Sequence, residues 1–499
     1  MAYRDANIVI IETGRTVIRA GLGLHELLKT PAVEFLARVG LRRSATSEFI
    51  DGRAEGRGVR PWKNRISLLP QVYDPKAQPH DYLVGVQLDE ALAAGQDIVI
   101  SWPFADGDVW NYTQAEAIWK HVIFKQLQRR RTQNESPVLH TISAGISRSV
   151  HESICQVFFE RFNVAGYAVI EKPLAQLYAA NSLSGVVVDI GLEKTDITPI
   201  YEGYIGHSNC VTIHIGVQDC QLYLAHLLRS NQSVVSALSP AGAPVDPATL
   251  QENLIALVKQ IWEDGHVKVP SDGETAAPED EGVTDIAAVL VAGKEKAVIE
   301  SGMKKKATAK ASAAEQARAR EIEALDLITI QFRNHSITLG KERHRFCEPL
   351  FDPSLLEGLT GFAPRPADRK PLPLQDAVGF SVNQADIDHR QYIWAGLFVT
   401  GDITKSVKGV AIALQSRLSP FLSNPDLQTD LQARAIRVLT VPEYYPEYRD
   451  TGNGYAAFLG SSITAKIIFN DNASKSYVTK ADYTTRGPHC IIEMAPTLL

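Results

Sequence analysis

The sequence has little of what marks disulfide-rich, membrane-spanning or strongly basic proteins. Its five cysteines are an odd number without a C-x-x-C pair, which argues against a disulfide framework or zinc site and favours free thiols in a reducing compartment. No apolar run approaches the length of a bilayer span, so we expect no membrane segment. Arg4 and Asp5 lead directly into an expected strand, so we expect no signal peptide. A formal charge of −6 gives no global reason to expect nucleic-acid binding.

What is present is ordinary for a globular protein. The chain has 499 residues, of which 45% are hydrophobic and 22% charged. This length is enough for two large domains with sizeable cores.

The most informative stretch is an apolar run that ends in an acid and a glycine, turns, and re-enters an apolar run. Residues 186–191 read Val-Val-Val-Asp-Ile-Gly, and residues 195–200 read Thr-Asp-Ile-Thr-Pro-Ile. The pattern predicts a buried strand, a tight turn and a second strand. Gly191 would let backbone amides approach a ligand, and Asp189 could hold a metal-bound water.

The same pattern occurs near the N-terminus. Residues 8–19 read Ile-Val-Ile-Ile-Glu-Thr-Gly-Arg-Thr-Val-Ile-Arg. For either hairpin alone, a simple turn glycine is the favoured interpretation, but two in one chain favour a duplicated phosphate-binding hairpin.

Helical and strand patterns alternate along the rest of the chain, which predicts an α/β fold with a ligand cleft between lobes. The expected helices span residues 113–127, 149–162, 174–181, 217–228, 250–262, 407–416 and 460–469. The expected strands span residues 98–101, 138–142, 392–400 and 435–441. Capping boxes are expected at Thr113 with Glu116 and at Ser149 with Glu152.

Three segments have loop or linker composition. Residues 40–80 are rich in Arg, Gly and Pro, and residues 231–248 resemble a Ser/Ala/Pro linker. Residues 265–320 have the composition of a weakly ordered insertion. Its basic run Lys304–Lys306 is interpreted first as a solvated face, with nuclear import or a phosphate-backbone contact as alternatives.

Several longer segments resemble actin and the actin-related proteins. Residues 198–204 read Thr-Pro-Ile-Tyr-Glu-Gly-Tyr, and residues 338–346 read Thr-Leu-Gly-Lys-Glu-Arg-His-Arg-Phe. Residues 459–463 and the late Tyr483 with Gly487 and Pro488 are also similar to actin segments, in the same order. The resemblance implies a two-lobed fold with a duplicated core and ATP in a central cleft.

The resemblance also implies a domain organisation. The first lobe would comprise residues 1–178 and 453–499, with a loop-rich small subdomain at about 40–100. The second lobe would comprise residues 179–452, with the low-complexity insertion at about 265–320.

The phosphate loops depart from the actin pattern. Actins have Asp-Asn-Gly-Ser-Gly where this chain has Glu12 to Thr16, so Arg15 replaces a phosphate-binding serine and either pairs with a phosphate or fills its site. In the second loop Glu193 places a carboxylate where backbone should face phosphate. The glutamine that positions actin's catalytic water falls at Glu171 or Lys172, and Asp402 replaces a glycine of the adenine loop.

These matches define a degenerate ATP cleft. Its candidate nucleotide-binding residues are Glu12, Gly14, Arg15, Thr16, Asp189, Gly191, Thr195, Lys259, Gly401 and Thr404. Asp189 is the candidate Mg²⁺ residue, through water, if nucleotide binds. Because phosphoryl transfer depends on positioning and electrostatics, we expect no enzymatic turnover, while residual ATP binding stays open.

Degenerate loops together with an insertion resemble the nuclear actin-related proteins, and among them the fungal class-nine group of SWI/SNF and RSC chromatin remodellers. The resemblance implies a nuclear scaffold subunit that binds a helix of the motor ATPase and a second actin-related protein, and contacts chromatin indirectly. Filament formation is not expected. Residues 144–149 and 458–463 correspond to walls of actin's groove for partner helices, with core packing as an equal alternative.

Two other functions stay open at this point. One is a nucleotide-binding or slowly hydrolysing actin-like ATPase of a cytoskeletal or other complex. The other is a direct DNA contact through the basic residues 303–320, which salt-dependent binding would reveal.

Overall fold

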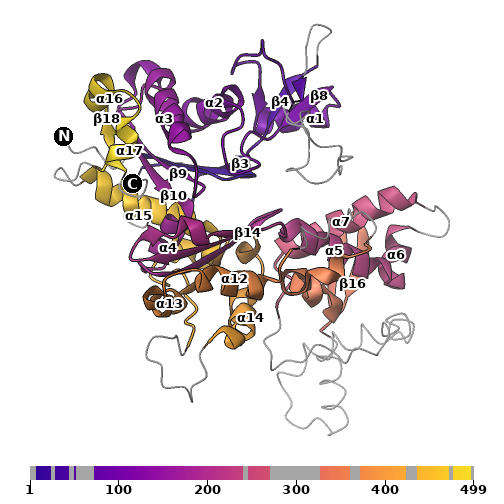
Figure 1. Ribbon diagram of the computed structural model, residues 1–499. Coiled ribbons are helices and arrows are strands. Elements are labelled where there is room, and N and C mark those ends of the chain that lie inside the picture. The colour runs from indigo at the N-terminus through magenta and orange to yellow at the C-terminus, as the bar shows by residue number, and fades with distance from the viewer. Residues whose placement is uncertain are drawn as a thin grey trace, which may run out of the picture. The chain divides into compact units, whose positions relative to one another are not determined.

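The computed structural model describes residues 7–23, 28–43, 50–51, 72–239, 245–269, 326–359, 371–422, 435–470 and 476–495 (Figure 1). Its mixture of helices and sheets confirms the α/β prediction. Contacts divide the chain into two compact units. The first comprises Met1–His214, Asp376–Lys405 and Ser419–Leu499, and the second comprises Ile215–Gln375 and Ser406–Leu418. The lobe boundaries at 178 and 453 stay a prediction.

Most of the expected insertion lies outside the described residues. Of the segment 265–320, only residues 265–269 are described, and Lys304–Lys306 is not among them. Parts of the loop-rich segment 40–80 also lie outside.

The first unit contains a mixed sheet of six strands. In spatial order these are β18 (Val478–Thr479), β10 (Gly166–Glu171), β9 (Pro137–Ile142), β1 (Val9–Thr13), β2 (Val17–Leu22) and β3 (Val33–Leu36). β1 and β2 form an antiparallel hairpin, and β9 and β10 continue from β1 in parallel. Every residue of β1, β9 and β10 is buried, as is typical of parallel strands covered on both faces.

A second sheet of the same unit repeats this arrangement. Its strands are β13 (Tyr204–Ile205), β12 (Thr195–Tyr201), β11 (Gly185–Ile190) and β17 (Leu397–Thr400), and β14 (Val211–Ile213) also pairs with β12. β11 and β12 form the antiparallel hairpin, and β17 lies parallel to β11. The two hairpins predicted from the sequence are therefore confirmed, and so is the duplication.

Smaller strands complete the first unit. β4 (Val39–Arg42) lies between β7 (Leu83–Val84) and β8 (Ile98–Ser101), and β5 (Ile50–Asp51) pairs with β6 (Val72–Tyr73). Helix α1 (Val86–Ala93) connects β7 to β8. The strand expected at 98–101 is confirmed.

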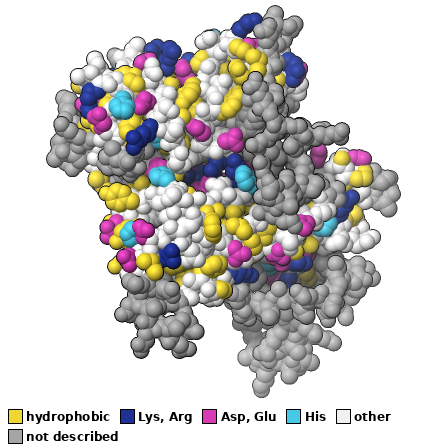
Figure 2. Space-filling view, viewed as in Figure 1, with side chains coloured by type: hydrophobic (Ala, Val, Ile, Leu, Met, Phe, Trp, Pro, Cys, Tyr) yellow, Lys and Arg dark blue, Asp and Glu magenta, His cyan; other side chains and the backbone are white. Residues whose placement is uncertain are grey.

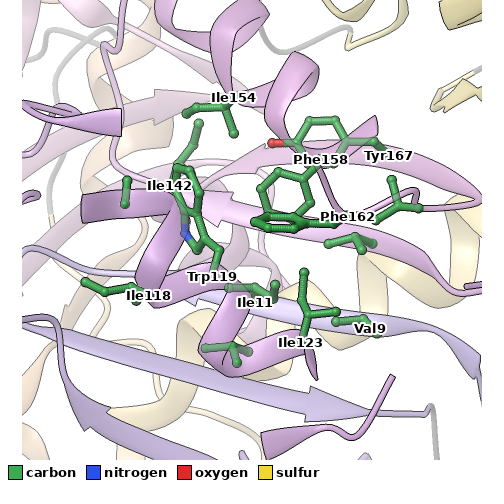
Figure 3. Packing of buried hydrophobic residues seen from close by; sticks show 14 of the residues in the cluster. Val9, Ile11, Ile118, Trp119, Ile123, Ile142, Ile154, Phe158, Phe162 and Tyr167 are labelled. Carbon is green, nitrogen blue, oxygen red and sulfur yellow. The ribbon is translucent and has the colours of Figure 1, made fainter. Parts of the chain in front are cut away.

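Helices and aromatic residues build the core beside the first sheet. α2 (Tyr112–Lys120) continues as a π-helix, η3 (His121–Gln126), and α3 (Arg148–Gln156) continues as η5 (Val157–Arg161). Figure 3 shows Trp119 of α2, Phe158 of η5 and Tyr167 of β10 in this core, and the ring centroids of Trp119 and Phe158 are 5.5 Å apart. The ring centroids of Phe158 and Tyr167 are 4.8 Å apart.

Both expected capping boxes are wrong, because each helix begins before the expected residue. Asn111 caps α2, and its side chain accepts a hydrogen bond from the backbone N–H of Gln114. Ser147 precedes α3, where no side-chain cap forms.

The C-terminal segment packs on the middle of the first unit. Its helices are α15 (Ala456–Asn470), α16 (Lys480–Arg486) and α17 (Cys490–Met494). α15 lies beside α4 (Lys172–Ala179), and β18 adds a strand beside β10 (Figure 1). Phe458 to Ser462 are buried in α15, so core packing accounts for this expected groove wall.

Three sequence predictions need correction. Helix α6 (Gln232–Leu238) occupies the expected linker, because the Asn231 side chain caps it. α13 (Ile387–Trp394) occupies the start of the expected strand 392–400, since Ile393 and Trp394 are buried as helix residues. In place of the expected strand at 435–441 there is one bridge, between Leu397 and Val438.

The second unit is mainly helical. Its elements are α5 (Val217–Arg229), α6, α7 (Pro247–Glu263), β15 (Ile328–Phe332), β16 (His335–Leu339), α11 (Glu348–Phe351) and α14 (Val410–Arg417). α12 (Leu374–Asn383) leads back into the first unit. No helix among the described residues combines the length and apolarity of a membrane span.

The contact between α4 and α15 generates a stability prediction. A Cβ atom on Gly460 would lie 1.7 Å from the carbonyl oxygen of Ala175, which is backbone and cannot rotate away. Gly460→Ala should therefore lower the free energy of unfolding by about 3 kcal/mol, although alanine favours helix. Urea denaturation measures this change. Ile467→Ala is the control, because Ile467 is 64% exposed on the same helix; an equal loss in both variants would contradict the packing argument.

Candidate functional site

The turns of both hairpins line one cavity of about 330 Å³ in the first unit. The lining also includes the start of α4, strand β14 and the turn after β17. Figure 2 shows basic and acidic side chains together in the hollow over β14. The cavity therefore lies where the duplicated hairpins predicted a ligand site.

Most of the residues predicted from the sequence meet there. Those in the lining are Glu12, Gly14, Arg15, Thr16, Asp189, Gly191 and Gly401. Thr195 is buried within β12, and Thr404 donates its hydroxyl to the carbonyl of Gly401. Lys259 belongs to α7 of the second unit, where it pairs with Glu263 at 3.7 Å.

The cavity glycines have steric roles in the fold. The amide of Gly14 donates to the carbonyl of Val17, and that of Gly191 to the carbonyl of Lys194, both at 3.0 Å. A Cβ on Gly14 would lie 2.8 Å from the Val17 oxygen. Gly401 has a φ of 100°, and a Cβ there would lie 2.4 Å from a backbone oxygen of β11. Larger residues would therefore strain these turns whether or not a ligand binds.

Arg15 bridges the two hairpins. Its guanidinium donates to both carboxylate oxygens of Asp196, and the second of these contacts measures 3.1 Å. The hydroxyl of Thr212 donates to the same carboxylate at 2.6 Å. Whether Arg15 pairs with a phosphate or fills its site stays a prediction; in the structure its guanidinium is paired with Asp196.

A lysine contacts the predicted metal residue directly. Lys172 Nζ lies 2.6 Å from Asp189 Oδ2, and Gln176 donates to the same oxygen at 3.0 Å. Burial acts to raise the pKa of Asp189, but the contacts with Lys172 and Gln176 hold this pKa below its ordinary value. A protein ammonium therefore neutralises the carboxylate that was expected to hold a metal-bound water.

The structure also separates the two candidates for the water-positioning residue. Lys172 lines the cavity, whereas Glu171 is buried beside it and accepts a hydrogen bond from the amide of Gly145 at 2.9 Å. Burial raises the pKa of Glu171.

Arg19 is a central residue that the sequence prediction missed. It is 5% exposed and donates to Glu12 and Asp402, both at 2.8 Å, and to Glu34 at 3.3 Å. Asp402, which stands where actins have a glycine of the adenine loop, is thus paired with Arg19. The missed signal lies in the hairpin register, which places Arg19 directly across from Glu12.

Thr13 ties the first hairpin to the core. It accepts a hydrogen bond from Trp119 Nε1 at 3.0 Å and lies 2.7 Å from His140 Nε2. The other ring nitrogen of His140 lies 2.9 Å from the hydroxyl of Tyr167. This buried chain fixes the end of β1 beside the cavity.

The charged side chains of the lining are largely paired with one another or with neighbouring residues. The lining carries four Lys and Arg side chains, namely Arg15, Arg19, Lys172 and Lys194. Within the described cavity each has a carboxylate partner; that of Lys194 is Asp106, at 3.5 Å. Five carboxylates share the lining, so a triphosphate would compete with them for the cations. Glu12 Oε2, Arg15 Nε and Asp189 Oδ1 are buried there without a hydrogen-bond partner in the described structure.

Comparisons with known proteins agree with the resemblance. The actin family model matches residues 4–260. The SWI/SNF and RSC complexes subunit arp9 of Schizosaccharomyces pombe is 25% identical, over 98% of this chain and 99% of its own length. Actin-related protein 7 of Arabidopsis thaliana is 25% identical over 81% of this chain and 87% of its own. Actin-related protein 7 of Oryza sativa subsp. indica is 25% identical over 78% of this chain and 84% of its own.

His140 generates a pH prediction. Burial lowers its pKa to about 3 in the folded protein, whereas an exposed histidine titrates near 6.5. Between these values the unfolded chain binds more protons at this position, so stability falls as the pH falls. The contribution reaches about 1.4 kcal/mol per pH unit. We expect urea midpoints to fall between pH 6.5 and pH 4.5.

A pair of histidine variants tests this assignment. His140→Gln should lower stability at pH 7 and reduce the slope of stability against pH. The slope should persist in part, because burial also lowers the pKa values of His121 and His151 to about 4. His389→Gln is the control, since that side chain is 38% exposed. Equal slopes in the two variants would refute the role of His140.

Proposed function

This chain belongs to the actin family, and from that premise we propose that it is a non-catalytic scaffold subunit of a nuclear ATP-dependent chromatin-remodelling complex. The proposal rests on the match to arp9, which extends over nearly the whole of both chains. The name of that relative places it in SWI/SNF and RSC complexes.

The observation that carries the non-catalytic assignment is the ion pair between Lys172 and Asp189. Phosphoryl transfer is catalysed by metal ions, a positioned nucleophile and neutralisation of phosphate charge. In this cavity the predicted metal residue contacts an ammonium, and Arg15 is already paired with Asp196. A nucleotide would have to displace these pairs before any chemistry began.

The finer part of the proposal concerns partners. We propose that the chain binds a helix of the motor ATPase and a second actin-related protein, that it contacts chromatin indirectly, and that it does not form filaments. Since Phe458 to Ser462 are buried, the exposed residues near Ala144–Ser149 are the better candidates for such a contact.

Purification from nuclear extract tests the assembly role. We expect the tagged full-length protein to retain a remodelling motor ATPase and a second actin-related protein in fixed ratio at moderate salt. Mass spectrometry identifies and counts the retained chains, with an untagged strain as background. Recovery of the protein alone, or with cytoskeletal partners only, would contradict the proposal.

Single-turnover hydrolysis tests the non-catalytic role. We expect no phosphate release above a protein-free control when Mg²⁺ and ATP are added to the purified protein. We also expect no shift in Tm, whereas ligand at a hundred times Kd would add about 2.7 kcal/mol of stability. A rate comparable to that of actin, and abolished by Asp189→Ala, would show that the site is a working ATPase.

A further inference from the structure

The two hairpins carry complementary charges at equivalent positions. In the first hairpin, Glu12 of β1 lies across from Arg19 of β2, which is an attractive pair. In the second, Asp189 of β11 lies across from Asp196 of β12, which is a repulsive pair. The second hairpin therefore depends on cations from outside itself, and the first hairpin supplies one of them.

Arg15 is the cation that the first hairpin supplies to the carboxylates of the second hairpin. It comes from the turn of the first hairpin and makes the two-pronged contact with Asp196 that best suits a guanidinium and a carboxylate. Its side chain is 24% exposed and that of Asp196 is 25% exposed, so solvent screens this pair only in part. Thr212 fixes the carboxylate from β14.

A third segment joins the same cluster. The turn at residues 104–107 packs against Arg15, since a Cβ on Gly107 would lie 3.1 Å from Arg15 Nε. Asp106 of this turn pairs with Lys194, which belongs to the second hairpin. Two ion pairs therefore connect three segments around the cavity.

We propose that these four residues form an electrostatic clasp, defined as Arg15, Asp106, Lys194 and Asp196, which holds the two hairpins together as a bound nucleotide otherwise would. This inference rests on the proposed absence of nucleotide turnover. Closure of the cavity then responds to ionic strength and not to ATP. The stability of one hairpin turn depends on a residue of the other.

Hydrogen exchange measures that dependence directly. The amides of Gly14 and Gly191 each close their own turn, so their exchange reports opening of each hairpin. In the full-length protein, Arg15→Met should speed exchange about tenfold in residues 189–196, and Asp196→Asn should do so in residues 12–17. The double variant should be no faster than either single variant, because one contact is lost in all three.

Two controls separate the clasp from general destabilisation. Arg486→Met removes a 2.6 Å ion pair with Glu493 in the same unit and should change exchange only near α16 and α17. Arg15→Lys keeps the positive charge but loses the two parallel N–H donors of the guanidinium, so it should speed exchange less than Arg15→Met does. It also provides a foldable variant if the methionine protein is unstable.

Hydrogen exchange at raised ionic strength and in the presence of nucleotide tests the clasp further. Raising KCl should speed exchange in both hairpins of the wild type together, and less so in the double variant. Unchanged exchange at 189–196 in Arg15→Met, or additive single effects, would overturn the clasp. Slower exchange in both hairpins on adding Mg²⁺ and ATP would also overturn it. Co-purification and single-turnover hydrolysis test the proposed function independently of hydrogen exchange. An exchange result that overturns the clasp therefore leaves the proposed function unaffected.

Discussion

The acid buried near the end of each hairpin's first strand has to be neutralised inside the fold, and this requirement organises the cavity. Glu12 and Asp189 are buried at equivalent positions of β1 and β11. An isolated carboxylate at such a site would be costly to desolvate. The first acid is matched by a cross-strand arginine, and the second by a lysine from α4. The ion pairs of Arg15 with Asp196 and of Lys194 with Asp106 lie beside these two.

The same requirement connects distant parts of the sequence. Arg19 reaches Asp402 after β17, and Lys405 of the same loop lies 2.6 Å from Glu34 of β3. Tyr455 donates to Glu34 at 2.5 Å and stacks beneath the ammonium of Lys405. These carboxylates are therefore paired with side chains from distant segments of the chain. The pairing is not complete, because Glu12 Oε2, Arg15 Nε and Asp189 Oδ1 are buried in the lining without a hydrogen-bond partner in the described structure.

Local pattern predicted the hairpins well because each depends on residues close in sequence. Alternating apolar runs, an acid and a turn glycine define β1–β2 and β11–β12 without reference to the rest of the chain. The ion pairs could not be predicted in this way, since Arg15 and Asp196 lie 181 residues apart. The end of α13 was assigned to a strand for a related reason: Ile393 and Trp394 are apolar, and whether such residues form helix or strand depends on what covers them. Arg19 was the one avoidable omission, because the hairpin register alone pairs it with Glu12.

The glycines that match the nucleotide-binding pattern are also required by contacts within the protein. Gly14 and Gly401 match the nucleotide-binding pattern, yet the structure explains each by contacts within the protein. A side chain on Gly14 would meet the carbonyl of Val17, and one on Gly401 would meet β11 and the carboxylate of Asp189. Removing either glycine would strain the fold even if ATP never entered the cavity. The glycines alone therefore cannot tell a chain that binds nucleotide from one that does not. The charged contacts of the cavity, such as that of Lys172 with Asp189, bear on this question more directly.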